Sequence, residues 1–259
     1  MDIKISTNNF NIPKINFKSG DDKKNVTTPK ESKLEKTPQN DTFEMSIGYV
    51  NDEHGQTNNM MRILSGLKGD LRVSAGDNDI GDEKNKAVHR ATMKFMNVAN
   101  ITAKGLGNHE LDTTQSDLMD SIEDFDGDIL ATNVKQMELE DEDPEEVKEL
   151  GRAPLIKNLK HSKIVDVKGE KVGLVGASPI DMLDRLTHPN YHNDCSIDEL
   201  EDTIEDIQEE VDKMKEQGVN KIFLLSHLGH QKDQIVAQKT KDIDVIIGGH
   251  THELVKDKK

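Results

Sequence analysis

Beyond Phe43, hydrophobic residues occur in short β-branched runs that stop at Gly, Asn, Asp or His, with amphipathic stretches between them. This pattern predicts an α/β protein with short buried strands. The expected strands are Ser46–Val50, Leu71–Ala75, Ile101–Gly105, Asp128–Thr132, Lys163–Val167, Val172–Ala177, Lys221–Ser226 and Asp244–Gly248. Lys168–Lys171 is expected to form a hairpin turn.

Two segments have the period of an amphipathic helix. Between Ile197 and Met214, apolar residues recur at steps of three or four and leave an acidic opposite face, which predicts a helix with one buried side. Lys84–Val98 is the second expected helix. The acidic segment Glu138–Glu149 is expected to be a solvated loop or helix insertion, with a cation-binding face as the alternative.

The first 42 residues differ from the rest of the chain. Asn, Ser, Thr, Lys and Pro dominate, and no period of 2 or 3.6 persists. We therefore expect a disordered tail over residues 1–42, without ligands or core residues, and one catalytic domain over residues 43–259.

Composition narrows the classes of function. The formal net charge is −16 and belongs mainly to the part beyond the tail, which disfavours binding to nucleic acid or anionic lipid. No apolar run is long enough to cross a bilayer, and the N-terminus lacks the apolar core of a secretory signal. The single cysteine, Cys195, fits a reducing compartment. A cytoplasmic protein without a membrane segment is expected.

Polar side chains gather where the expected strands end. The endings read YVNDEHG, SAGDNDIG, KGLGNHELD, ILATN, LLSHLGH and IIGGHTHE. In an α/β sheet, the carboxyl ends of parallel strands converge on one edge, so residues distant in sequence can form one site there.

The first two endings supply carboxylates and an imidazole. Asp52 and His54, two residues apart, can point to the same side and share a cation, although solvated loop residues are the alternative. Asp77 lies between glycines that permit close approach to an ion, and its carboxylate could bridge two metals. The alternative is an Asp-rich turn or helix cap, for which Asp79 and Asp82 are better candidates.

The ending GNHELD is more specific. The amide of Asn108 can ligate a metal without adding charge, which leaves His109 free to act on a substrate. Asp112 could hold the His109 imidazole in one tautomer. A helix N-cap by Asn108 is the alternative.

Three histidines complete the set of candidates. His227 ends one strand, and His250 and His252 follow the last one beside a diglycine. Any one of them could be a hydrogen-bonded core histidine, but three at strand ends favour metal ligation.

The ordered series D-x-H, GD, GNHE, H and GHTH resembles the calcineurin-like metallophosphoesterase superfamily. NDEHG, GNHELD and IIGGHTHE narrow the resemblance to the catalytic domain of the 5′-nucleotidase branch, which includes 2′,3′-cyclic phosphodiesterases and UDP-sugar hydrolases. The resemblance covers about Met45 to Val255. It implies a four-layer α/β fold in which a two-layered β-sandwich is flanked by helices.

The resemblance also implies a role for each candidate residue. One ion would be held by Asp52, His54 and His252, the other by Asn108, His227 and His250, and Asp77 would bridge the two ions. His109 would be the catalytic residue, and Asp112 would orient it. Asn108 and His109 would also contact the substrate. Two divalent ions are implied, and mixed oxygen and nitrogen ligands suit Mn, Fe, Co, Ni or Zn better than Ca.

The implied function is hydrolysis of a phosphoester, in which a hydroxide between the two ions attacks phosphorus. The expected substrate is a small phosphoester, most simply a nucleotide, cleaved as a monoester or a cyclic diester. The alternatives are a truncated, non-catalytic metal-binding or interaction domain, and a nuclease, which the negative charge disfavours. No base-stacking platform can be named, since only 3% of the residues are aromatic.

The chain ends seven residues after His252, at LVKDKK. By comparison with the family, the final strands of the catalytic domain and a substrate-binding domain are expected to be missing. We therefore expect a fragment of a longer reading frame, with a minimal protein as the alternative.

Overall fold

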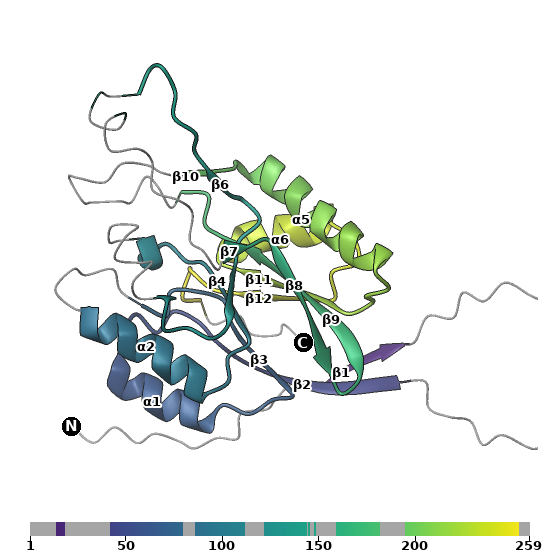
Figure 1. Ribbon diagram of the computed structural model, residues 1–259. Helices are drawn as coiled ribbons and strands as arrows, with labels where there is room; N and C mark the ends of the chain where they lie inside the picture. Colours follow the sequence, from purple (N-terminus) through teal and green to yellow (C-terminus); the bar gives the residue numbers. More distant parts are fainter. Residues whose placement is uncertain are drawn as a thin grey trace, which may run out of the picture.

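The computed structural model describes residues 14–18, 42–79, 86–111, 122–143, 145, 148, 159–181 and 195–253 (Figure 1). In these residues the strands form two main sheets and a two-stranded ribbon. The first sheet has the order β1 (Lys14–Lys18), β2 (Thr42–Val50), β3 (Leu71–Ser74), β4 (Ala103–Gly105), β5 (Asp128–Leu130) and β7 (Leu159–Lys160). The second has the order β12 (Val245–Gly248), β11 (Ile222–Ser226), β9 (Glu170–Ala177) and β8 (Ser162–Val167). The ribbon pairs β10 (Cys195–Ile197) with β6 (Val134–Gln136).

Most strands in each main sheet are parallel. β2, β3, β4, β5 and β7 run in one direction, and only β1 is antiparallel to its neighbour. In the second sheet β9, β11 and β12 are parallel and β8 is antiparallel. The loops that follow these parallel strands therefore collect at their carboxyl ends.

The two main sheets lie between two pairs of helices, which gives four layers (Figure 1). A hydrophobic cluster fills each space between neighbouring layers. The cluster between the two sheets includes Val73, Leu174 and Phe223. A second packs the outer face of the first sheet against α1 (Thr57–Gly66) and α2 (Lys86–Val98), and a third packs the second sheet against α5 (Leu200–Glu216) and α6 (His230–Lys239). The predicted α/β fold, a β-sandwich flanked by helices, is confirmed.

All eight predicted strands are present, with ends shifted by a few residues. The predicted hairpin turn is also present, because Val167 pairs with Glu170 across the β8–β9 turn. Lys168 and Gly169 at its centre both have positive φ, at 54° and 85°. This is the signature of the type I′ turn, whose twist matches that of the flanking strands.

The predicted helix Ile197–Met214 begins later than expected, at Leu200. Ile197 is in β10 instead, where it pairs with Val134. Ile204, Ile207, Val211 and Met214 form the buried face, as the spacing predicted. Ile197, the first apolar residue of the periodic segment, pairs across the ribbon and is therefore extended. An extended residue cannot be part of a helix, so α5 begins after it.

Several elements were not predicted. β6, β7 and β10 have only two or three residues each, too few to show a period. The helix α6 buries only Asp233 and Val236, so its sequence lacks a clear apolar stripe. Helix α1 was also missed, and it buries only Met60 and Leu64.

The expected disorder of residues 1–42 is wrong for Lys14–Lys18, which form β1 and pair with Thr42–Ser46 of β2. The sequence KINFK alternates polar and apolar residues over only five positions, so its pairing depends on the distant β2 edge and not on local pattern. The rest of the predicted tail, except Thr42, lies outside the described residues.

Deleting residues 1–18 is expected to increase self-association and lower the melting temperature, because it exposes the backbone edge of β2. Cation binding should be retained, since no candidate ligand is removed. Light scattering, thermal unfolding and manganese titration would measure the three effects. Deletion of residues 1–13, which leaves β1 intact, is the matched control. Loss of cation binding on deletion of residues 1–18 would contradict this prediction.

Within the acidic segment Glu138–Glu149, the described residues from Glu138 to Asp143 form a largely exposed loop that contains a turn. This agrees with the solvated loop that was expected. Among the described residues, no helix combines the length and the apolar composition needed to cross a bilayer.

Candidate metal centre

Every candidate ligand that the structure describes follows the carboxyl end of a strand. Asp52 and His54 follow β2, Asp77 follows β3, Asn108 and His109 follow β4, His227 follows β11, and His250 and His252 follow β12. The loops that follow strands of both sheets therefore meet at one site. Asp112 lies outside the described residues, so its orienting role stays a prediction.

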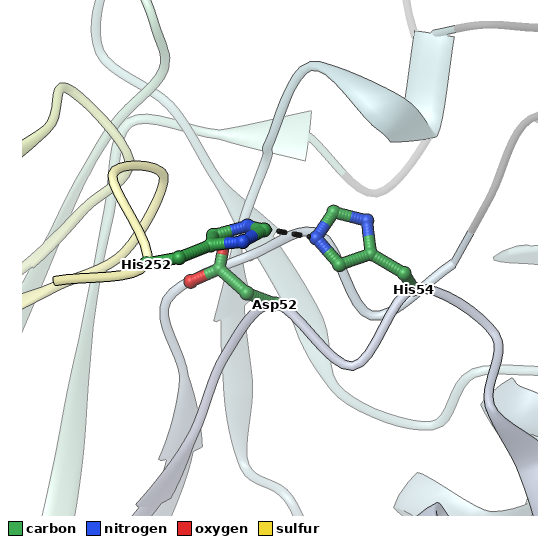
Figure 2. A group of neighbouring side chains, drawn as sticks. All are labelled: Asp52, His54 and His252. Carbon is green, nitrogen blue, oxygen red and sulfur yellow. Dashed lines mark hydrogen bonds and ion pairs between the residues drawn. The ribbon is translucent and has the colours of Figure 1, made fainter.

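The first cluster consists of Asp52, His54 and His252 (Figure 2). The Nε2 atoms of His54 and His252 point toward each other and lie 3.0 Å apart, and His252 Nε2 is 3.2 Å from Asp52 Oδ1. The candidate ligand atoms of all three residues lie within 4.8 Å of one another. The His252 side chain is 57% exposed, so this cluster is open to solvent.

The second cluster consists of Asp77, His227 and His250, whose candidate ligand atoms again lie within 4.8 Å of one another. Asp77 Oδ2 is 2.9 Å from His227 Nε2, and both side chains are buried. The two clusters are adjacent, because the His250 backbone N–H donates to Asp52 Oδ1 at 3.0 Å. Asp52 Oδ1 is also 3.7 Å from His227 Nε2.

His109 lies beside both clusters. Its backbone N–H donates to Asp77 Oδ1 at 2.9 Å, and its ring centroid is 4.7 Å from that of His54. His54, Asp77 and His109 form a third group that could hold a metal ion. Geometry therefore brings His109 to the site and leaves two roles for it, as a ligand or as a group that acts on substrate.

Backbone conformation sets the candidate ligands apart. Five of them have positive φ, at 56° for Asp52, 48° for His54, 50° for Asp77, 81° for His250 and 53° for His252. A non-glycine residue in the left-handed region costs about 1–3 kcal/mol, and such residues concentrate at functional sites. The loops therefore hold these residues in backbone conformations that local preference alone would not select.

The family model described as calcineurin-like phosphoesterase matches residues 45–254. The chain belongs to the calcineurin-like phosphoesterase family. The predicted resemblance to the calcineurin-like metallophosphoesterases is therefore confirmed.

Individual relatives agree with the predicted branch. The chain is 28% identical over 240 residues to a snake venom 5′-nucleotidase from Naja atra, which covers 82% of this chain and 41% of that protein. It is 33% identical over 163 residues to the 5′-nucleotidase of Mus musculus, and this match covers 61% of this chain and 25% of that protein. The chain thus spans less than half the length of these two relatives.

A solved structure supports the fold. The 5′-nucleotidase precursor from Thermus thermophilus superposes with a TM-score of 0.64 at 24% identity, over 82% of this chain and 42% of that one. At this identity the likeness shows the common architecture alone.

The ligand set of this family member fits divalent cations. His227 Nδ1 lies 2.7 Å from the Ala75 carbonyl oxygen, so it carries the proton and donates. In a neutral ring, His227 Nε2 then carries a lone pair, and this nitrogen lies 2.9 Å from Asp77 Oδ2. A proton or a cation is needed between these two acceptors. The buried amide oxygen of Asn108 likewise has no hydrogen-bond partner among the residues that the structure describes, as expected of a metal ligand.

Charge and burial act in opposite directions at the centre. Burial would raise the pKa of Asp77, but the hydrogen bond and charge of His227 outweigh it and lower the pKa. Burial would lower the pKa of His227, but the contact with Asp77 outweighs it and raises the pKa. Burial also lowers the pKa of His54, so its ring is biased toward the neutral form that binds metals.

Three buried charged residues behind the candidate ligands were given no role by the sequence motifs. Glu53, between Asp52 and His54, is buried and accepts a hydrogen bond from Asn78 Nδ2 at 2.6 Å. Burial raises the pKa of Glu53 to about 7. Lys104 and Glu110 form an ion pair that is fully buried. The lysine within the apolar run ITAKGLG was the available signal, because an isolated buried charge requires a partner.

Proposed function

We propose that this chain is the catalytic portion of a phosphoester hydrolase that binds two divalent cations and acts on nucleotides. The observation that carries the proposal is the pair of adjacent clusters, in which a buried Asp77 carboxylate lies next to His227. Asp52, His54 and His252 would hold one cation and Asn108, His227 and His250 the other, with Asp77 bridging. Bound there, the cations would offset phosphoryl charge and lower the pKa of a water molecule.

The residues of the chain have distinct tasks in this scheme. Asp77 Oδ1 fixes the His109 backbone through the 2.9 Å hydrogen bond, so His109 keeps a constant position relative to the clusters. Hydrolysis adds water across a P–O bond, and the departing oxygen must gain a proton. A protonated ring nitrogen of His109 would supply that proton.

The open side of the site suits a small substrate. His252 is exposed, whereas Asp77 and His227 are buried, so a phosphoryl group would enter beside the first cluster. A nucleotide is proposed because the relatives are 5′-nucleotidases. Monoester and cyclic diester substrates both remain within the proposal. We also propose a cytoplasmic location, supported by the single, buried Cys195.

Hydrolysis by this chain is expected to depend on added cations. Removal of metal with a chelator should abolish release of phosphate from adenosine monophosphate and of nitrophenol from p-nitrophenyl phosphate, and Mn²⁺ should restore both. Parallel assays with a 2′,3′-cyclic nucleotide and single-stranded DNA would separate the substrate classes. Cation binding without turnover of any ester would favour a metal-binding domain, and turnover of DNA alone would favour a nuclease.

His252→Asn should lower both manganese binding and turnover, since it removes a ligand from the first cluster. His161→Asn is a matched control, because His161 is similarly exposed, at 50%, and is not in any candidate metal group. Equal effects of the two substitutions would contradict the assignment of the first cluster.

A further inference from the structure

A buried ion pair lies directly behind the candidate centre. Lys104 is in β4 and Glu110 is in the short 3-10 helix His109–Leu111, and both side chains have no exposed area. Lys104 Nζ donates to Glu110 Oε1 at 2.8 Å. A buried charge pair often adds little net stability compared with apolar residues of similar size, so its presence here calls for another explanation.

The Glu110 carboxylate connects the two loops that carry Asp77 and His109. Oε2 accepts from the backbone N–H groups of Gly107 at 2.8 Å and Asp77 at 3.1 Å, and Oε1 accepts from the N–H of Asn78 at 3.0 Å. Asp77 in turn accepts from the His109 N–H. The loops after β3 and β4 are therefore held together from both sides.

There is little room for these loops to adjust. A Cβ atom added at Gly107 would lie 2.1 Å from Asp77 Oδ1 and 2.6 Å from Asp77 N. The Asp77 backbone, with φ of 50°, is in a conformation that its neighbours must maintain. Glu110 supplies that restraint through the Asp77 N–H.

We propose that Lys104 and Glu110 are positioning residues that set the placement of Asp77 between the two clusters. Glu110 holds the Asp77 loop, and Lys104 neutralises Glu110, so the pair orders the loop without adding net charge beside the cations. This inference rests on the proposed two-cation centre, and it adds a determinant of cation affinity that contacts neither cation nor substrate.

Glu110→Gln is the direct test. The amide keeps one acceptor oxygen but turns an NH₂ group toward backbone N–H donors. We expect the affinity for Mn²⁺, measured by calorimetry on the folded metal-free protein, to fall by about 10- to 100-fold. The electron paramagnetic resonance spectrum should lose the coupling between two neighbouring Mn²⁺ ions at concentrations that saturate the wild type. Lys104→Met should give a smaller loss, because Glu110 keeps its N–H contacts.

Lys221→Met is the matched control for loss of a buried lysine. Lys221 is 4% exposed and pairs with Glu170 at 3.0 Å, just before β11 begins and so at the opposite end of that strand from His227. It should lower the melting temperature and leave Mn²⁺ affinity unchanged. If Glu110→Gln does the same, the pair is merely structural and the proposal is overturned.

A double variant guards against misfolding of the single ones. Lys104→Met with Glu110→Gln removes both charges, so no unpaired charge is buried, and it should fold yet bind Mn²⁺ more weakly than the wild type. Wild-type affinity in this variant would overturn the proposal. A wild type that binds Mn²⁺ without hydrolysing esters would overturn the proposed function alone, and one that binds no Mn²⁺ would overturn both.

Discussion

Asp77→Asn is expected to reduce turnover by about 1,000-fold or more and to weaken binding of both cations. A neutral amide bridges two cations poorly, and the loss of several kcal/mol of charge stabilisation corresponds to that factor. The metal-free variant should remain folded, because an amide can donate to His227 Nε2, which the carboxylate faces at 2.9 Å. Manganese stoichiometry, turnover and thermal unfolding of the metal-free protein would be measured together.

Asp70→Asn provides the same chemical change away from the site. Asp70 precedes β3, is paired with Lys168 at 2.7 Å, and accepts from the Ser46 N–H at 2.8 Å. We expect its replacement to leave cation binding and turnover unaltered. Full occupancy at both cation positions in Asp77→Asn would remove Asp77 from the bridging role.

His109→Ala is expected to retain the cations and to reduce turnover by about 100- to 10,000-fold, the range for loss of a positioned acid. The reason is that the departing oxygen would leave without a proton. The loss should be small for aryl phosphates, whose leaving groups need little protonation, and large for nucleoside monophosphates. Steady-state kinetics on both esters and metal analysis of the variant would measure these effects.

The alternative role of His109 gives a different result. Because His109 also belongs to a group that could hold a metal ion with His54 and Asp77, loss of a cation in His109→Ala would identify it as a ligand. Equal losses on aryl and alkyl esters would make it a substrate clamp. Asp112→Asn should copy the acid pattern more mildly if Asp112 orients the ring.

The layers of the fold were predictable because their strands and helices carry local patterns. Ile204, Ile207 and Val211 recur at helical spacing and became the buried face of α5. β1 was not predictable, because its pairing with β2 is decided by an edge that lies far away in the sequence. Ile197 was assigned to the wrong element because periodicity cannot show that a neighbouring segment will pair with it.

The identity of the candidate ligands could be proposed from sequence, because polar residues that follow parallel strands lie at the same edge of the sheet. Their distances could not, and neither could the contact of His227 with the Ala75 carbonyl oxygen, which fixes its tautomer. The supports behind the ligands were also hidden. Glu110 was visible within the GNHE motif, but its hydrogen bonds to the Asp77 and Asn78 backbones depend on how two loops meet.

At the candidate ligands with positive φ, the residue type that best suits the backbone differs from the one that can bind a cation. A glycine at position 52, 54, 77, 250 or 252 would adopt the observed φ without the penalty that a side chain incurs. Glycine there would also delete a candidate ligand. Selection for thermal resistance of the metal-free protein would therefore tend to erase the centre, whereas selection with cations present would preserve it, because bound ligands stabilise only the native state. Variant libraries of this chain should accordingly be screened in the presence of metal.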